Sequence, residues 1–212
     1  MPEISSPEAE KAAGLVHKFR LSGGPDAPLV LLVHGRAGNC DVMWAFIRCI
    51  PEGWNILAPQ APYPDVVGGF SWWDINATDA RSGGELAASR VEGFLSGAAK
   101  FYGLAPRFVL ALGFSQGAGT LSLLVQRRDI LVGAGLLAGF VIEDPAAPPT
   151  KTKIFMAHGD GDEMVPIERA RRGRDFLIGR GYTVDYVEDP VGHKVGTSGM
   201  RALKSWIESF DG

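Results

Sequence analysis

Short apolar runs alternate with segments of helical periodicity along most of the chain. The runs at 29–33 and 108–112 contain only apolar residues, which is typical of strands buried on both faces, as in a parallel sheet. Segments with apolar residues three or four positions apart predict helices between them. Residues 17–21 are interpreted as an edge strand, and 59–77 and 143–150 as irregular loops. The remaining predicted strands are 54–58, 130–137, 153–157 and 183–187, and the predicted helices are 40–50, 85–102, 116–127, 167–180 and 199–210.

This alternation predicts a three-layer α/β fold, in which helices cover both faces of a mostly parallel central sheet. Connections of this length form right-handed βαβ units. The sequence has no internal repeat, charge run or low-complexity linker, so residues 1–212 are interpreted as one domain. In such sheets ligands bind outside the carboxyl ends of the strands, and candidate site residues are therefore sought there.

The pentapeptide Gly113-Phe114-Ser115-Gln116-Gly117 lies between a predicted strand and a predicted helix. A sharp strand-to-helix turn exposes a serine hydroxyl, and glycines two residues to either side remove side chains that would clash. This is the nucleophile elbow of α/β-hydrolases. Ser115 is the candidate nucleophile, and the alternative is an ordinary turn.

A serine nucleophile needs a base, and the base needs an orienting acid. In the α/β-hydrolase order the acid and then the histidine follow the serine, which favours His193 over His158 as the base. Asp162 and Asp160 compete for the acid. Asp162 is preferred because it lies further past the end of its strand, and Asp160 then supports the loop.

The tetrahedral intermediate of acyl transfer needs hydrogen-bond donors for its negative oxygen. The backbone N–H of Gln116 is one predicted donor, at the start of its helix. The second is the N–H of Arg36, since Gly35 lets the backbone approach a ligand closely. An alternative for the Arg36 side chain is a surface charge with no role, which would leave the role of its backbone N–H unaffected. His34 is interpreted as a structural hydrogen-bonding residue.

Composition narrows the classes of partner. The net charge of −3 gives no basic footprint for nucleic acid or for an anionic membrane. No apolar stretch reaches the roughly 20 residues that span a bilayer, and the polar N-terminus lacks a secretory signal. Cys40 and Cys49 fall in one predicted helix, roughly 13 Å apart, too far for a disulfide. Reduced thiols in a cytoplasmic protein are expected.

The chain resembles the phospholipase/carboxylesterase family of α/β-hydrolases, which includes the acyl-protein thioesterases. The resemblance rests on Gly113–Gly117 and on four further segments: Leu32-Val33-His34-Gly35-Arg36, Ala58-Pro59-Gln60-Ala61-Pro62, Ser71-Trp72-Trp73-Asp74-Ile75 and His158-Gly159-Asp160-Gly161-Asp162-Glu163-Met164-Val165-Pro166. It implies an α/β-hydrolase fold and supports Asp162 as the acid. It also places Trp72 and Trp73 beside the acyl pocket. Relatives often carry Leu at the position of Arg36.

The resulting hypothesis is a serine esterase that needs no metal or cofactor and hydrolyses small ester substrates, or thioesters, with short to medium acyl chains. Phe70 and Met164 lie on loops expected to overhang the strand ends and, with the two tryptophans, are predicted to line the substrate pocket. No insertion is long enough for a large lid. The alternatives are a lactonase like dienelactone hydrolase and a catalytically idle binding protein. The sequence does not decide between a monomer and a homodimer.

Overall fold

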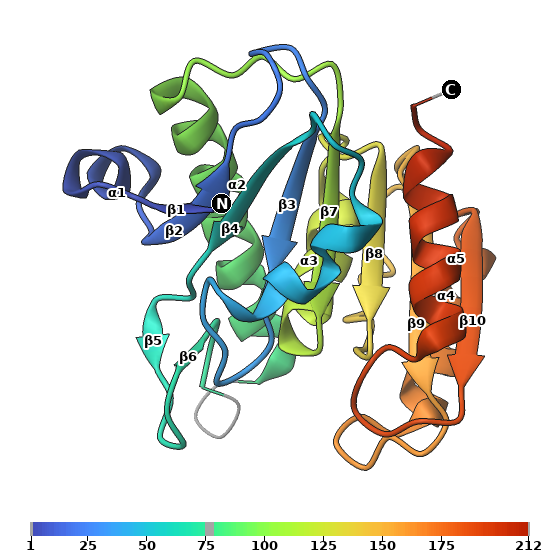
Figure 1. Ribbon diagram of the computed structural model, residues 1–212. Helices are drawn as coiled ribbons and strands as arrows, with labels where there is room; N and C mark the ends of the chain where they lie inside the picture. Colours follow the sequence, from blue (N-terminus) through green and yellow to red (C-terminus); the bar gives the residue numbers. More distant parts are fainter. Residues whose placement is uncertain (1, 75–78, 212) are drawn as a thin grey trace.

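The computed structural model describes residues 2–74 and 79–211. Its centre is an eight-stranded sheet with the order β1-β2-β4-β3-β7-β8-β9-β10 (Figure 1). From β4 to β10 neighbouring strands are parallel, whereas β1 and β2 run antiparallel to their neighbours. The predicted mostly parallel sheet is confirmed. The strands are β1 (Glu3–Ile4), β2 (His17–Arg20), β3 (Leu29–Val33), β4 (Asn55–Pro59), β7 (Val109–Phe114), β8 (Gly133–Leu137), β9 (Lys153–Gly159) and β10 (Val184–Asp189).

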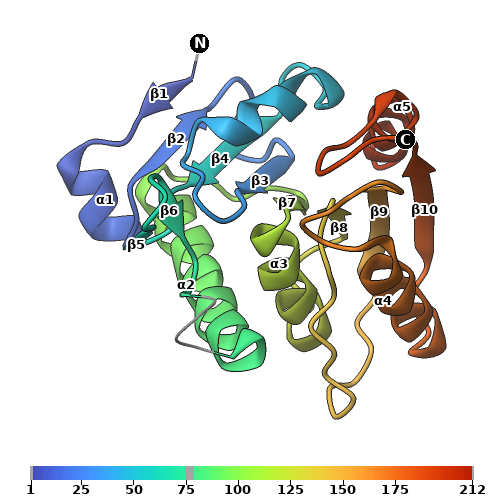
Figure 2. The same ribbon diagram turned by 90° about the horizontal axis from the view of Figure 1, so that it is seen from below.

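Alternate residues of β3 pack into two separate cores, one on each face of the sheet. Leu31 and Val33 contribute to one core, and Val30 and Leu32 contribute to the other, because successive side chains of a strand point to opposite faces. Figure 2 shows the two helical layers that cover these faces. One layer contains α1 (Pro7–Ala13), α2 (Ala80–Phe101), α3 (Gln116–Arg127) and α4 (Ile167–Gly179), and the other contains η1 (Val42–Cys49) and α5 (Thr197–Glu208).

The segment predicted as a helix at 40–50 forms the 3₁₀ helix η1, which starts after Cys40. Its buried residues are Met43, Phe46 and Cys49. This spacing of three places them on one face at three residues per turn, as in a 3₁₀ helix. Both cysteines are buried and unpaired.

Helix α2 begins at Ala80, five residues before the predicted start. Two hydrogen bonds cap it, since the Asp79 carboxylate accepts the N–H groups of Arg81 and Ser82, both at 3.0 Å. Glycine is unfavourable inside a helix, but Gly83 allows α2 to pack closely against the Trp73 side chain. A Cβ atom at Gly83 would lie 2.4 Å from Cγ of Trp73.

Two further differences concern short elements. The strand predicted at the edge, β2, lies inside the sheet because β1 pairs with its outer side. Helix α1 was not predicted, although Ser6 caps it and Pro7 opens it, and both residues are typical helix-start signals. The predicted loop at 59–77 contains a small hairpin of β5 (Tyr63–Pro64) and β6 (Phe70–Ser71); its last residues, 75–77, lie outside the described part.

Candidate active site

Ser115 occupies a strained turn between β7 and α3. Its φ of 53° and ψ of −112° are unfavourable for a residue with a side chain, and such strain costs about 1–3 kcal/mol. The glycines on either side make the turn sterically feasible. A Cβ at Gly113 would lie 2.5 Å from the Gly117 carbonyl oxygen, and a Cβ at Gly117 would lie 2.2 Å from that of Val33. This is the arrangement that the pentapeptide predicts.

His193 and Asp162 form a hydrogen-bonded pair. Nδ1 of His193 lies 2.7 Å from Oδ2 of Asp162, whose side chain is fully buried. The other carboxylate oxygen accepts the N–H groups of Met164 and Val165, both at 2.9 Å. Because a carboxylate only accepts, Nδ1 carries the hydrogen and Nε2 of His193 is left as the basic nitrogen.

Several opposing effects set the pKa of Asp162. Burial raises it, but hydrogen bonds from the Val165 N–H and from His193, together with the Met164 N–H, bring the net pKa below its usual range. Asp162 is therefore ionised at neutral pH, as the orienting acid of a catalytic histidine must be.

The two alternatives that the sequence left open occupy different environments. Asp160 is exposed, and its backbone N–H donates to the carbonyl of Asp189. His158 is buried, with Nε2 2.8 Å from the carbonyl oxygen of Val165 and 3.3 Å from Oδ2 of Asp162. Both neighbours are acceptors, so Nε2 of His158 carries a hydrogen and supports the acid.

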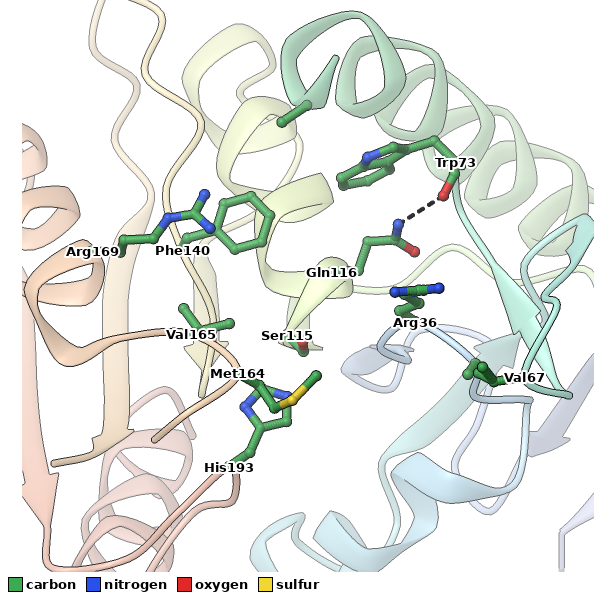
Figure 3. A pocket seen from close by; sticks show the side chains of 12 residues that line it. Arg36, Val67, Trp73, Ser115, Gln116, Phe140, Met164, Val165, Arg169 and His193 are labelled. Carbon is green, nitrogen blue, oxygen red and sulfur yellow. Dashed lines mark hydrogen bonds between the residues drawn. The ribbon is translucent and has the colours of Figure 1, made fainter. Parts of the chain in front are cut away.

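Ser115 and His193 line two cavities in common. The first, here the Trp73 cavity, has a volume of about 310 Å³, and the second, here the Phe46 cavity, has about 600 Å³. Figure 3 shows Ser115 and His193 on one side of the Trp73 cavity. Between these two described side chains the structure has no hydrogen bond, and such contacts are often long before substrate binds.

The predicted oxyanion donors both line the Trp73 cavity. Among the described residues, no acceptor pairs with the backbone N–H of Arg36 or of Gln116. Gly35 brings the first of these close to the nucleophile, since a Cβ there would lie 3.1 Å from Cβ of Ser115. Two unpaired N–H groups beside a candidate nucleophile are what an oxyanion hole requires.

His34 holds the loop that carries the Arg36 N–H. Nε2 of His34 accepts the N–H of Ala61 at 2.9 Å, so Nδ1 carries the hydrogen and donates to the Gly35 carbonyl at 2.6 Å. Burial lowers the pKa of His34 to about 4. The imidazole is therefore neutral and structural, as the sequence indicated.

The Arg36 side chain is held by Asp65. Its Nε lies 2.9 Å from Oδ2 of Asp65, whose carboxylate also accepts from the Ser71 hydroxyl at 2.6 Å and from the Val67 N–H at 3.1 Å. These partners, with Arg36 the strongest, hold the pKa of Asp65 well below its usual range. The Arg36 side chain is therefore fixed by an ion pair and is not a free surface charge. Asp65 lies 29 residues from Arg36 in sequence, and no sequence signal identified it.

The side chain of Gln116 fixes the segment that carries the two tryptophans. Its Oε1 accepts the Trp72 N–H, and its Nε2 donates to the Trp73 carbonyl, both at 2.9 Å; Figure 3 shows the second of these bonds. The residue proposed as an oxyanion donor through its backbone thus also positions one wall of the cavity.

Only two of the four residues predicted to bind substrate line the Trp73 cavity, namely Trp73 and Met164. Trp72 is completely buried, and its indole N–H donates to the His34 carbonyl at 2.8 Å. Phe70 lies in β6, where its N–H pairs with the Gly38 carbonyl and its ring packs against the core. Trp72 and Trp73 lie in a bend after β6, and only Trp73 reaches the cavity.

The sequence did not indicate three further residues that line the Trp73 cavity, namely Val67, Phe140 and Arg169. Val67 lies between β5 and β6, Phe140 follows β8, and Arg169 lies in the first turn of α4. Within the described residues, no group of three or more His, Cys, Asp or Glu side chains gathers as metal ligands would. None of the described helices is long and apolar enough to cross a membrane.

Comparisons with known proteins identify the family to which this chain belongs. The sequence model of the phospholipase/carboxylesterase family matches residues 20–210. The chain belongs to this family. Acyl-protein thioesterase 1 of Neurospora crassa is 27% identical over 212 residues, which cover 84% of each protein.

Two further relatives bear on the fold and on the extent of the match. A probable carboxylesterase of Oryza sativa subsp. japonica is 29% identical over 115 residues, or 50% of this chain and 43% of the rice protein. The match therefore spans less than half of that relative. The crystal structure of the Bacillus cereus carboxylesterase superposes with a TM-score of 0.82 at 19% identity, covering 95% of this chain and 97% of that one. The chain has the α/β-hydrolase fold that this family shares.

Proposed function

We propose that this protein is a serine esterase that hydrolyses carboxylic esters of short to medium acyl chains, and thioesters as a second substrate class, through an acyl-enzyme. One observation carries the proposal. Ser115, a histidine bound to a buried carboxylate, and two residues whose backbone N–H groups have no acceptor in the described part of the chain all line one cavity. These are the parts that acyl transfer needs.

In the first half-reaction Ser115 Oγ attacks the ester carbonyl carbon while Nε2 of His193 takes the hydroxyl proton. The carbonyl oxygen becomes negative and accepts hydrogen bonds from the N–H groups of Arg36 and Gln116. Asp162 stabilises the imidazolium that forms. Collapse of the intermediate breaks the ester bond, and His193 returns the proton to the departing alcohol or thiol.

The second half-reaction repeats these steps with water. His193 removes a proton from a water molecule, whose oxygen attacks the acyl carbon bound to Ser115. The same two N–H groups hold the second oxyanion. Breakdown releases the acid and returns the proton to Ser115, so the enzyme is regenerated without a net change.

The substrate class rests on the family and on the shape of the site. The related proteins named above are described as a thioesterase and as carboxylesterases. We assign the acyl chain to the Trp73 cavity, whose volume of about 310 Å³ is at the small end of the range for small-molecule sites. A cavity of this size favours short to medium acyl chains over long-chain lipids.

Replacement of Ser115 by Ala tests the proposal. Turnover of p-nitrophenyl butyrate should fall by about 10³-fold or more, because the nucleophile is lost while the cavity and the oxyanion donors stay. A fluorophosphonate probe should label the wild-type protein and not this variant. Ser89→Ala, on the exposed side of α2, is the control and should keep both properties. Activity of Ser115→Ala within about tenfold of the wild type would exclude Ser115 as the nucleophile.

A further inference from the structure

Arg169 differs from the other arginines of α4. Arg171, Arg172 and Arg174 pair with Glu188, Glu143 and Asp175 at 2.7–2.8 Å. Arg169, the one that lines the Trp73 cavity, has no acidic partner and no side-chain hydrogen bond among the described residues. Its guanidinium lies over the Phe140 ring, 4.2 Å from the ring centre, and Figure 3 shows the two side chains together at the cavity wall.

The position of Arg169 is unfavourable for a cation in the free protein. Partial burial lowers its pKa, and the charge of nearby Arg172 lowers it further. It also lies in the first turn of α4, where the helix dipole disfavours positive charge. Stacking on Phe140 offsets part of this cost. An unpaired cation in such a place is stabilised when an anion binds beside it.

The surroundings of Ser115 carry positive charge without nearby acids in the cavity walls. The described residues that line the Trp73 and Phe46 cavities include no Asp or Glu, but they include Arg36, Arg48, Arg169 and Lys194. Residues 75–78, which the structure does not describe, contain no charged residue either. The chain as a whole has a net charge of −3, so the positive charge is a local property of the site.

We propose that the ester substrate carries a carboxylate and that Arg169 binds it at the wall of the Trp73 cavity. This inference rests on the proposed esterase function and narrows its substrate class. The Phe140 ring covers one face of the guanidinium and leaves the N–H edge free, and two parallel N–H groups match the two oxygens of a carboxylate. Arg36 is unsuited to this task because Asp65 already occupies its guanidinium.

Two matched ester pairs test the proposal, one for each side of the ester bond. The acyl pair is p-nitrophenyl hexanoate and mono-p-nitrophenyl adipate, and the alcohol pair is phenyl butyrate and 4-carboxyphenyl butyrate. For each pair the ratio of kcat/KM, charged over neutral, is measured for the wild type, Arg169→Gln and Arg172→Gln. Arg172 is the matched control, since it lies one turn away on the same helix, is paired with Glu143 and does not line the Trp73 cavity.

In at least one pair, Arg169→Gln should lower the charged-over-neutral ratio by about tenfold or more, as expected for loss of a charged hydrogen bond. The ratio corrects for any general effect of the substitution on hydrolysis of the neutral ester, and Arg172→Gln should keep the wild-type ratio. Should Arg169→Gln not fold, Arg169→Lys replaces it, and the ratio should then fall by a smaller factor because the charge remains without the two-pronged geometry.

Two results would overturn the proposal while the esterase function stands. In the first, Arg169→Gln leaves the charged-over-neutral ratio unchanged in both pairs. In the second, Arg172→Gln lowers that ratio as much as Arg169→Gln does. A wild-type protein that hydrolyses none of the four esters and takes no fluorophosphonate label would overturn the proposed function itself. The neutral esters thus separate the two failures.

Discussion

Asp162 lies between two histidines, and their other hydrogen bonds decide which can act as a base. The Nε2–H of His158 points at the Val165 carbonyl, 2.8 Å away, in a buried environment. His193 binds Asp162 through Nδ1 and leaves Nε2 for the serine proton. The order of residues along the chain had already favoured His193, and the hydrogen bonding gives an independent physical reason.

The acid assignment is tested by Asp162→Asn beside Asp160→Asn. The first change should lower kcat by up to about 10⁴-fold, because an amide stabilises the wrong tautomer of His193. The second should have little effect, since Asp160 is exposed and its side chain makes no hydrogen bond among the described residues. Kinetics with a p-nitrophenyl ester would measure both, and the reverse ranking would transfer the role to Asp160.

His34 should make the protein less stable in mild acid. Its pKa in the folded state is about 4, against about 6.5 for an ordinary histidine. Between these values the unfolded chain binds a proton that the folded chain does not. Stability therefore rises with pH in this window, and the contribution is complete above about pH 6.5 and lost as the pH falls toward 4, by about 3 kcal/mol at most.

Two measurements check this expectation. The His34 ring signals in NMR spectra should not titrate between about pH 7.5 and 5.5. The free energy of unfolding should fall less steeply from pH 6.5 to 4.5 in His34→Gln than in the wild type. A titration of His34 midway near pH 6.5 would mean that its bond from the Ala61 N–H does not hold the neutral ring.

At the scale of elements, Gln116 joins the start of α3 to the segment of Trp72 and Trp73. Gln116→Leu should leave the Trp72 N–H and the Trp73 carbonyl without partners. A buried polar group left unpaired costs about 1–3 kcal/mol, so for these two groups we expect a loss of about 2–6 kcal/mol in unfolding free energy. Gln116→Glu keeps the acceptor for the Trp72 N–H and should lose less.

The same variants separate the two roles of this residue. The oxyanion donor is a backbone N–H, so kcat per folded molecule should stay within a few-fold of the wild type while stability falls. Thermal unfolding and active-site titration would give the two quantities. A large loss of kcat with unchanged stability would show that the side chain, and not the backbone, acts in the reaction.

Elements set by local pattern were predictable, and those set by distant contacts were not. The 116–127 helix and the strand 29–33 have the predicted bounds, because uninterrupted periodicity and the glycines of the elbow mark them. The start of α2 was missed because Gly83 is needed for contact with Trp73, which only the fold reveals.

The same distinction holds for the site. The predicted nucleophile, base and acid follow strand ends in a fixed order, so topology alone brings them together. The Arg36–Asp65 pair and the Arg169–Phe140 stack join segments 29 residues apart in sequence. Side chains meeting across loops leave no periodic signal. Trp72 and Trp73 also look alike in sequence, and both are buried in the core, although only Trp73 also lines the cavity.

At the scale of the whole molecule, charge is distributed unevenly. The net charge of −3 does not suggest that the protein binds anions. The described walls of both cavities around Ser115, however, contain no Asp or Glu. Most surface arginines, such as Arg128 with Glu92, are neutralised by local pairs. Arg48, Arg169 and Lys194, which have no acidic partner among the described residues, line these cavities, so a bulk property of the sequence says little about what the site attracts.

The extent of the cavities sets the last prediction, which concerns acyl length in neutral p-nitrophenyl esters. Each buried CH₂ contributes about 0.8 kcal/mol, so kcat/KM should rise by up to about fourfold per methylene until the Trp73 cavity is filled. Its rim is open, since Val67 and Met164 are 73% and 71% exposed, and further methylenes would stay in water. We expect a plateau of kcat/KM between butyrate and octanoate, then a decline, with no jump above the micelle threshold.

Trp73→Ala should flatten this rise in kcat/KM and leave hydrolysis of the acetate ester nearly unchanged. Val66 is 92% exposed and lies outside this cavity, so Val66→Ala should keep the wild-type rise. A steady rise to palmitate would mean that the protein buries long chains in a space that opens only with substrate.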